Sequence, residues 1–195
     1  MQTADPTVFE AIKRGYPEFD QSNPEDIIDF FNNLDPDSVT GHLSNIKGIY
    51  FEQLVADNLQ EAGLDAVLFE QINHPNADIL IDSDFWMGAA DFQVKATDSA
   101  SYIASTLEEN PDIPIIVTSE VASDFDGNSM IIDSGISNED LTEAVTGSVL
   151  SGDASDLIDP GIGDALSDNI SDTLADAVTD SIFPFSPFWL LGLPF

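Results

Sequence analysis

The chain has 195 residues and no cysteine, so disulfide bonds, thiolate metal ligands and cysteine nucleophiles are excluded. Its 37 acidic residues against 4 basic ones give a formal net charge of -33, while 43% of the residues are hydrophobic, enough for a sizeable core. The acidic residues are spread along the whole chain, which favours adaptation to high salt, because concentrated salt screens the repulsion between like charges. A surface that mimics DNA or one that binds cations is the alternative interpretation.

The same charge argues against ordinary nucleic-acid binding, because phosphate contacts normally come from clustered Lys and Arg. The basic residues are Lys13, Arg14, Lys47 and Lys95. Lys95 is the most informative of them, since it is kept in an apolar-flanked segment of a chain that has almost no lysine. The opening residues MQTADPTVFE carry neither a basic region nor an apolar run, so we expect no secretory signal.

The first part of the chain predicts helices. Residues 1–43 are expected to form a helical, acidic lead-in, in which NPEDIIDFFNNL has helical spacing of apolar residues and Asn23 as N-cap before Pro24. A longer helix is predicted from Ser44, because SNIKGIYFEQLVADNLQEAG has an apolar stripe and ends at Gly63, a C-cap candidate.

Strands dominate the next part of the chain. Short segments rich in strand-forming residues lie at 65–72, 77–82 and 90–97. The elements expected after them are a helix capped by Asp98 or Ser99, the apolar strand IPIIVTSE, a short strand at SMIID, and a helix that begins at Ser137 with Asp140 at its third position.

The C-terminal part changes character. Aliphatic residues step by four from Ile158 to Ile182 and aspartates step in parallel, which predicts an amphipathic helix whose apolar stripe winds slowly around it. Residues 183–195, FPFSPFWLLGLPF, are apolar but too short to span a bilayer, and prolines interrupt them. We expect residues 152–195 to bind a protein partner or a second copy, or to fold back on the chain's own core, with no membrane span.

Acidic side chains are expected to gather around one lysine in the predicted sheet. Because side chains alternate across a strand, Asp91, Gln93 and Lys95 point to one face, and Asp78 lies on the neighbouring strand. Glu52 is expected on or beside the buried face of the preceding helix. Such a set suits metal-assisted hydrolysis of a phosphodiester, since Mg²⁺ takes oxygen ligands and a lysine can orient water and offset negative charge.

Residues 44–120 resemble the PD-(D/E)xK nuclease superfamily, which includes restriction endonucleases, Mrr-like enzymes and archaeal Holliday-junction resolvases. KGIYFEQLVADNLQEAGLDAVLF is similar to the start of the resolvase-like members, and QVKATDSASYI is similar to their third strand and following helix. The resemblance implies an α/β fold with a restriction-endonuclease-like αβββαβ core, a mixed central sheet and a C-terminal helical extension. The expected division is a lead-in at 1–43, a nuclease-like domain at 44–150, an acidic helical segment at 151–182 and an apolar tail at 183–195.

Roles for single residues also follow from the resemblance. By position, it implies that Lys95 is the catalytic lysine, Glu52 the helix acid, Asp78 the metal-binding aspartate and Gln93 the second ligand. Mg²⁺ or Mn²⁺ is the implied cofactor, with Glu52 and Asp91 as further ligands. The chain departs from the family at two positions. Ala77 stands where Pro is usual, and Gln93 stands where Asp or Glu is usual, which weakens the affinity for metal.

The leading hypothesis is a Mg²⁺-dependent DNA nuclease from a halophilic archaeon, its virus or a mobile element, located in a high-salt cytoplasm or associated with virions. DNA binding is electrostatically disfavoured outside high salt. One alternative is a catalytically inactive nuclease-like fold that serves as a structural or interaction module, and another is an acidic inhibitor that mimics DNA. In a purely structural interpretation, Lys95 is a buried lysine paired with Asp78 or Asp91, and Glu52 is an exposed helix residue.

The charge surplus predicts that the fold loosens at low ionic strength. Unscreened like charges repel over a Debye length of about 30 Å at 0.01 M salt but only roughly 3 Å at 1 M. A thermal melt across a series of KCl concentrations should therefore show a midpoint that rises with added salt. A midpoint that stays flat or falls would contradict the salt-adaptation interpretation.

Overall fold

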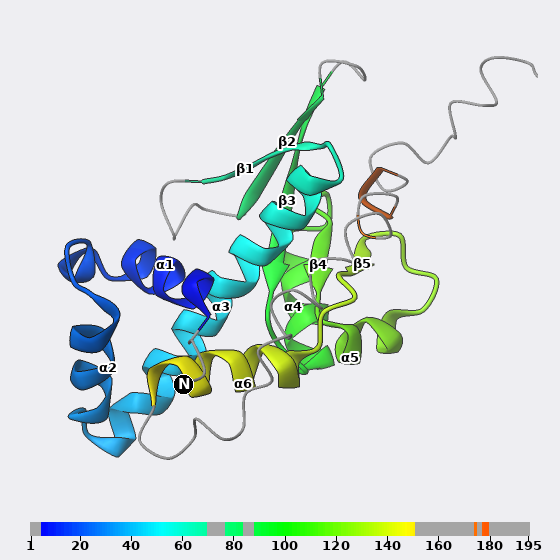
Figure 1. Cartoon of the computed structure of the whole chain (residues 1–195). Helices are drawn as coiled ribbons and strands as arrows, with labels where there is room; N and C mark the ends of the chain where they lie inside the picture. Colours follow the sequence, from blue (N-terminus) through cyan, green and yellow to red (C-terminus); the bar gives the residue numbers. More distant parts are fainter. Residues whose placement is uncertain (1–4, 70–76, 84–87, 151–173, 175–176, 180–195) are drawn as a thin grey trace, which may run out of the picture.

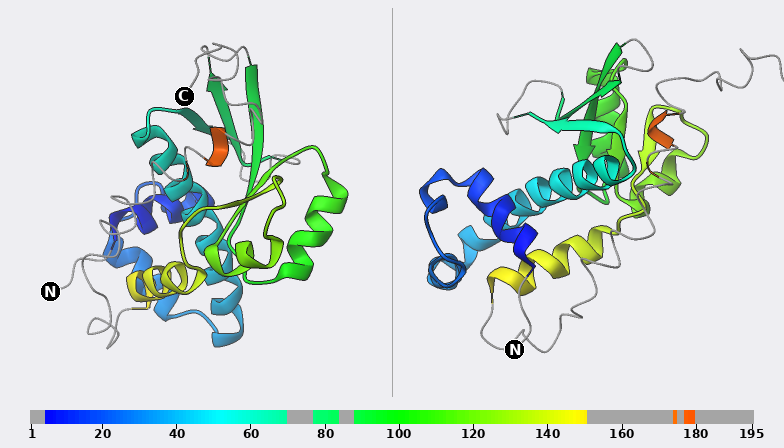
Figure 2. Two further views of the ribbon diagram at one scale, coloured as in Figure 1. Left: turned by 90° about the vertical axis from the view of Figure 1, so that its right-hand side faces the viewer. Right: turned by 45° about the horizontal axis from the view of Figure 1, so that its top comes forward.

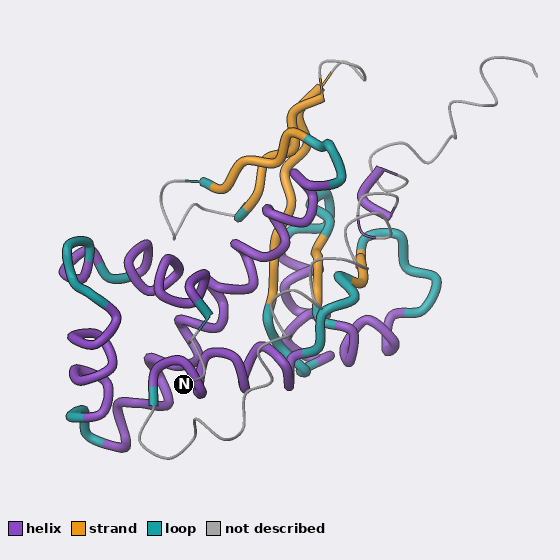
Figure 3. Tube along the Cα trace, in the orientation of Figure 1, coloured by secondary structure: helices purple, strands orange, loops and turns teal. Residues whose placement is uncertain are grey.

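The computed structural model describes residues 5–69, 77–83, 88–150, 174 and 177–179, which form an α/β fold around a five-stranded mixed sheet (Figure 1). The helical N-terminal part precedes all of the strands in the chain (Figure 3). The elements of this part are α1 (Pro6–Gly15), the short 3-10 helix η1 (Pro17–Phe19), α2 (Pro24–Asn32) and α3 (Pro36–Glu61). The strands are β1 (Asp65–Leu68), β2 (Ile79–Ser83), β3 (Gly88–Lys95), β4 (Ile115–Val117) and β5 (Ile131–Asp133). The remaining helices are α4 (Ala100–Glu109), α5 (Ser119–Ala122), the 3-10 helix η2 (Ser123–Phe125) and α6 (Asn138–Val149).

Helices α1, α2 and α3 each begin with an Asx–Pro pair. The side chains of Asp5, Asn23 and Asp35 each accept a hydrogen bond from a backbone N–H in the first helical turn. Proline follows each cap at the first helical position, where no N–H is needed and its fixed φ suits the helix. The Asn23 cap was predicted. Helix α3 begins at Pro36, ahead of the expected start at Ser44, so the expected boundary between residues 43 and 44 lies inside this helix.

The end of α3 is fixed by Gly63, as the sequence predicts. Gly63 has a φ of 87°, a conformation that side chains disfavour, and its N–H donates to the carbonyl of Gln60. The N–H of Leu64 donates to the carbonyl of Leu59, which completes a Schellman motif. The chain therefore turns directly from α3 into β1.

Strand β3 joins two kinds of pairing in one sheet. The strand order is β1-β2-β3-β4-β5, in which β1, β2 and β3 are antiparallel neighbours, whereas β4 and β5 run parallel to β3. The first part of β3 pairs with β2, with Ile79 opposite Phe92. Its last three residues pair with β4, with Lys95 opposite Val117. Toward the carboxyl end of β3, pairing with β2 thus ends and pairing with β4 begins.

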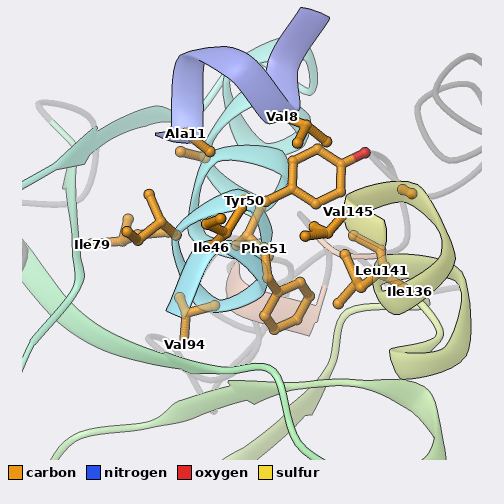
Figure 4. Close-up of a cluster of buried hydrophobic side chains, with 14 of the residues drawn as sticks. Val8, Ala11, Ile46, Tyr50, Phe51, Ile79, Val94, Ile136, Leu141 and Val145 are labelled. Carbon is orange, nitrogen blue, oxygen red and sulfur yellow. The ribbon is translucent and has the colours of Figure 1, made fainter. Parts of the chain in front are cut away.

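Helix α3 lies against one face of the sheet and α4 against the other (Figure 2). Around α3, the side chains of Tyr50 and Phe51 are fully buried among residues of α1, the sheet and α6 (Figure 4). On the α4 face, a smaller cluster consists of Ile103, Ile115, Val117 and Val121. Burial of one large apolar side chain stabilises the fold by about 1.5–3 kcal/mol, so the α3 cluster is the main source of stability.

One expectation for the later elements needs correction. The expected strand IPIIVTSE ends at Val117, because Ser119 and Glu120 belong to α5. Thr118 at this transition is fully buried and donates from its hydroxyl to the carbonyl of Thr97. Helices α4 and α6 begin as predicted, with Ser99 and Ser137 as their N-caps.

Little of the expected C-terminal helical segment and none of the apolar tail at 183–195 falls among the described residues. Leu174 and Val178 are helical and buried in the α3 cluster, so the aliphatic stripe docks on the chain's own core at these positions. In the described part of the chain, no helix combines the length and apolar character that crossing a membrane demands.

Asp5 offers a test of how α1 is fastened to α3. Its Oδ1 accepts from the N–H of Thr7 at 2.9 Å and its Oδ2 accepts from the Tyr50 hydroxyl at 2.7 Å. Asp5→Ala removes a helix cap and leaves a buried hydroxyl without its acceptor, so we expect a loss of about 2 kcal/mol in unfolding free energy.

The matched control is Asp35→Ala, which removes a cap of α3 that accepts from the N–H of Asp37 at 3.3 Å. This variant should lose about 1 kcal/mol or less. Both are measured by urea denaturation in molar KCl. Equal losses for the two variants would show that the Tyr50 contact adds nothing.

Candidate functional site

Asp78 and Lys95 meet where β2 separates from β3. Asp78 directly precedes β2, and its Oδ2 accepts hydrogen bonds from the backbone N–H of Val94 at 2.8 Å and from Nζ of Lys95 at 3.0 Å. The Asp78 carboxylate thus accepts the bond from the Val94 N–H, beside the residue that precedes the first residue of β2. The side chains of Lys95 and Asp78 are 24% and 12% exposed, so the ion pair lies at the edge of the interior.

Glu52 forms a second ion pair beside the first. It lies on α3 and is only 8% exposed, which excludes the interpretation as an exposed helix residue. Arg14, in the last turn of α1, places Nη1 at 2.9 Å from Glu52 Oε2 and donates from Nη2 to the carbonyl of Phe69 at 3.2 Å. One guanidinium therefore ties α1, α3 and the residue that follows β1.

The two ion pairs belong to one electrostatic unit, here named the charged cluster: Arg14, Glu52, Asp78 and Lys95. Burial and the nearby Asp78 carboxylate raise the pKa of Glu52 to about 7, although Arg14 and Lys95 act in the opposite direction. The influence of all three groups on Glu52 means that they lie in the same region. Near neutral pH, Glu52 can therefore both bind and release a proton.

The other predicted ligands have different surroundings. Gln93 lies on β3, two residues before Lys95, and is 5% exposed. Asp91 is exposed and lies opposite Leu80, further along the sheet from Asp78. The structure thus brings Glu52, Asp78 and Lys95 together, keeps Gln93 in the adjoining interior, and leaves Asp91 on the open face.

Arg14 is the member of the charged cluster that sequence reasoning missed. Its rarity was a signal, because every basic residue is conspicuous in a chain with 37 acidic residues and 4 basic ones. The position of α1 against α3 is not predictable from local pattern, so the sequence alone assigns Arg14 to the helical lead-in and to no site.

The charged cluster contains carboxylate oxygens, the type of donor that Mg²⁺ and Mn²⁺ take in proteins. In the described part of the chain, the ion pairs and the Val94 bond use Oε2 of Glu52 and Oδ2 of Asp78, which leaves Oε1 and Oδ1 for a cation. No group of three or more His, Cys, Asp or Glu side chains with metal-binding geometry occurs among the described residues. Two carboxylates fit a hard cation that keeps most of its waters, the usual manner in which Mg²⁺ binds.

Comparison of the chain with protein-family models, with curated proteins and with solved structures found no significant match. The geometry of the charged cluster and the fold are therefore the basis for the functional argument.

The raised pKa of Glu52 predicts a pH dependence of stability. The folded protein binds a proton at Glu52 more tightly than the unfolded chain, so the stability that Glu52 contributes is complete below about pH 4.5 and is lost as the pH rises through about 7. In Glu52→Gln, this loss is absent. The unfolding free energy of Glu52→Gln minus that of the wild type should therefore increase by up to about 3 kcal/mol between pH 4.5 and 8.

Urea denaturation of both proteins at fixed molar KCl measures this difference. Glu18→Gln is the control, because Glu18 is exposed, and its difference from the wild type should stay constant with pH. A constant difference for Glu52→Gln as well would mean that Glu52 is ionised throughout this range.

Proposed function

We propose that the chain is a metal-dependent phosphodiesterase that acts on DNA, with the charged cluster as its active site. The observation that supports this most is the Lys95–Asp78 contact of 3.0 Å at the separation of β2 from β3, with Glu52 alongside. The element order also supports the proposal. Helix α3 is followed by the antiparallel strands β1, β2 and β3, then by α4 and by β4, which is parallel to β3. This order is the one expected of the αβββαβ core of the PD-(D/E)xK nucleases. Glu52, Asp78 and Lys95 are among the residues that the resemblance singles out.

Three members of the charged cluster, Glu52, Asp78 and Lys95, have a chemical role in this proposal. Asp78 and Glu52 would hold the cation, and the amide oxygen of Gln93 would be a further neutral ligand. A bound Mg²⁺ or Mn²⁺ supplies charge that polarises the phosphate and favours ionisation of water. Lys95 donates hydrogen bonds that orient the attacking water and offset the negative charge that develops on the phosphate oxygens.

The reaction consumes one water molecule. Its oxygen forms a bond to phosphorus, the bond from phosphorus to one ester oxygen breaks, and that oxygen takes a proton from solvent and leaves as an alcohol. Because Glu52 is assigned to the cation, the proton that the attacking water loses passes to solvent. The products are a phosphomonoester and a free hydroxyl.

A non-catalytic structural module is the second candidate, and one observation favours it. Each carboxylate of the charged cluster already has an internal cationic partner, Arg14 for Glu52 and Lys95 for Asp78. Two part-buried ion pairs of this kind can fasten α1, α3 and the sheet without any ligand. In this function the cluster would be retained for conformational specificity.

Substitution of Lys95 distinguishes the two candidates. In molar KCl with Mg²⁺ or Mn²⁺, the wild type should cleave DNA and Lys95→Met should lose activity by about 10²-fold or more, because the donor that offsets phosphate charge is gone. The measurement is the initial rate of cleavage of a labelled oligonucleotide mixture.

Lys95→Met leaves Asp78 without its cation, so a second variant guards against a folding artefact. Asp78→Asn with Lys95→Met removes both charges at once and should melt close to the wild-type temperature, yet remain inactive. Lys13→Met, which removes a cation elsewhere on α1, should keep its activity. An inactive wild type, or an active Lys95→Met, would favour the structural module.

A further inference from the structure

The basic side chains differ in their freedom to contact a phosphate. Lys47 donates to Asn138 Oδ1 at 2.7 Å and to Thr142 Oγ1 at 3.5 Å, so its ammonium group is committed to joining α3 and α6. Arg14 and Lys95 lie in the charged cluster, with side chains that are 19% and 24% exposed. Both cations that can act at the site are therefore only partly accessible.

Arg14 and Lys95 keep donors beyond those that the ion pairs use. A guanidinium carries five N–H donors and an ammonium three. Among the described residues, Arg14 donates to Glu52 and to the carbonyl of Phe69, and Lys95 donates to Asp78. The remaining donors of each side chain can bind the oxygens of one phosphate, since guanidinium and ammonium groups both bind phosphate well.

The sheet next to the charged cluster repels a long phosphate backbone. Residues Asp65, Asp82 and Asp91 are exposed, and they alternate with the side chains that pack against α3, so they lie on the open face. Asp65 is directly opposite Asp82 in the register of β1 and β2. A duplex carries one negative charge per about 1.7 Å of its axis, so a duplex laid along this face would bring many phosphates against carboxylates.

We infer, on the basis of the proposed function, that the site takes a strand end or a short single strand, which it holds through about two phosphates at Arg14 and Lys95. A strand end reaches the charged cluster with few phosphates and leaves the rest of the nucleic acid away from the acidic sheet face. Arg14 then has two functions, since it positions Glu52 and binds substrate.

The salt dependence of binding should reflect the small number of phosphate contacts. For single strands, the logarithm of the binding constant falls with the logarithm of the salt concentration with a slope of about -0.7 per neutralised phosphate. Two contacts give a slope of about -1.4, which allows binding to persist in molar salt. A nuclease that holds a long backbone through six or more contacts has a slope steeper than about -4.

The binding experiment uses the full chain and a fluorescent single strand of about eight nucleotides, with Ca²⁺ in place of Mg²⁺, between 0.5 and 3 M KCl. The expected slope is about -1.4 for the wild type and about -0.7 for Arg14→Gln. Lys13→Gln, with the neighbouring residue of α1 changed, should keep the wild-type slope. Arg14→Lys retains the charge and should restore the wild-type slope even if Arg14→Gln is poorly folded. A slope steeper than about -4, a slope that Arg14→Gln leaves unchanged, or no binding would overturn the inference.

The cleavage experiment separates this inference from the proposed function. With Mg²⁺ in molar KCl, the short strand should be cut at least tenfold faster than closed circular duplex DNA, and bis(p-nitrophenyl) phosphate should be hydrolysed as a minimal phosphodiester. Equal rates on the circular duplex and the short strand would overturn the inference and leave the proposed function intact. Failure with all three substrates would overturn the proposed function, and the inference with it.

Discussion

Three of the four basic side chains join elements that are distant in the sequence, in a chain whose 37 acidic residues repel one another. Arg14 bonds to Glu52 across a separation of 38 residues, Lys47 to Asn138 across 91, and Lys95 to Asp78 across 17. Each of these cations is partly withdrawn from solvent, where salt screens a charge pair less than at the surface. The few cations therefore fasten α1 and α6 to α3, and the carboxyl end of β3 to the residue that precedes β2.

Helix α3 connects these contacts. It carries Lys47 and Glu52 five residues apart, and between them Tyr50 and Phe51 are fully buried. The helix thereby fixes the polar contacts relative to the apolar core. A small rotation of α3 would move Glu52 away from Arg14 and at the same time disturb the packing of both aromatic side chains. Core packing and site geometry are therefore set by the same helix.

Most elements of the fold could be predicted from local chemistry. Asn23, Gly63, Ser99 and Ser137 each mark a helix end by a mechanism that acts within a few residues. The apolar stripe predicts a start of α3 at Ser44, whereas the Asp35–Pro36 pair marks its true start ahead of the stripe. The end of β4 was misplaced because an apolar run does not reveal where a strand gives way to a short helix.

The candidate site was predictable in part, because one of its contacts follows from the local pattern of a strand. Strand alternation places Lys95 toward Asp78, and the structure brings them to 3.0 Å. The contribution of Arg14 depends on how α1 packs against α3, which is a tertiary contact with no local signature. The burial of Glu52, and with it the pKa of about 7, likewise depends on elements that are far apart in the chain.

The Asp5 and Arg14 contacts of α1 have a consequence for modularity. Both ends of this helix are bound to α3, through Tyr50 at the start and Glu52 near the end. A fragment trimmed to residues 44–150 would cut α3 within its length and lose both contacts. The smallest transplantable unit is therefore larger than this fragment by the whole N-terminal region, and gene fusions or domain grafts would have to respect that boundary.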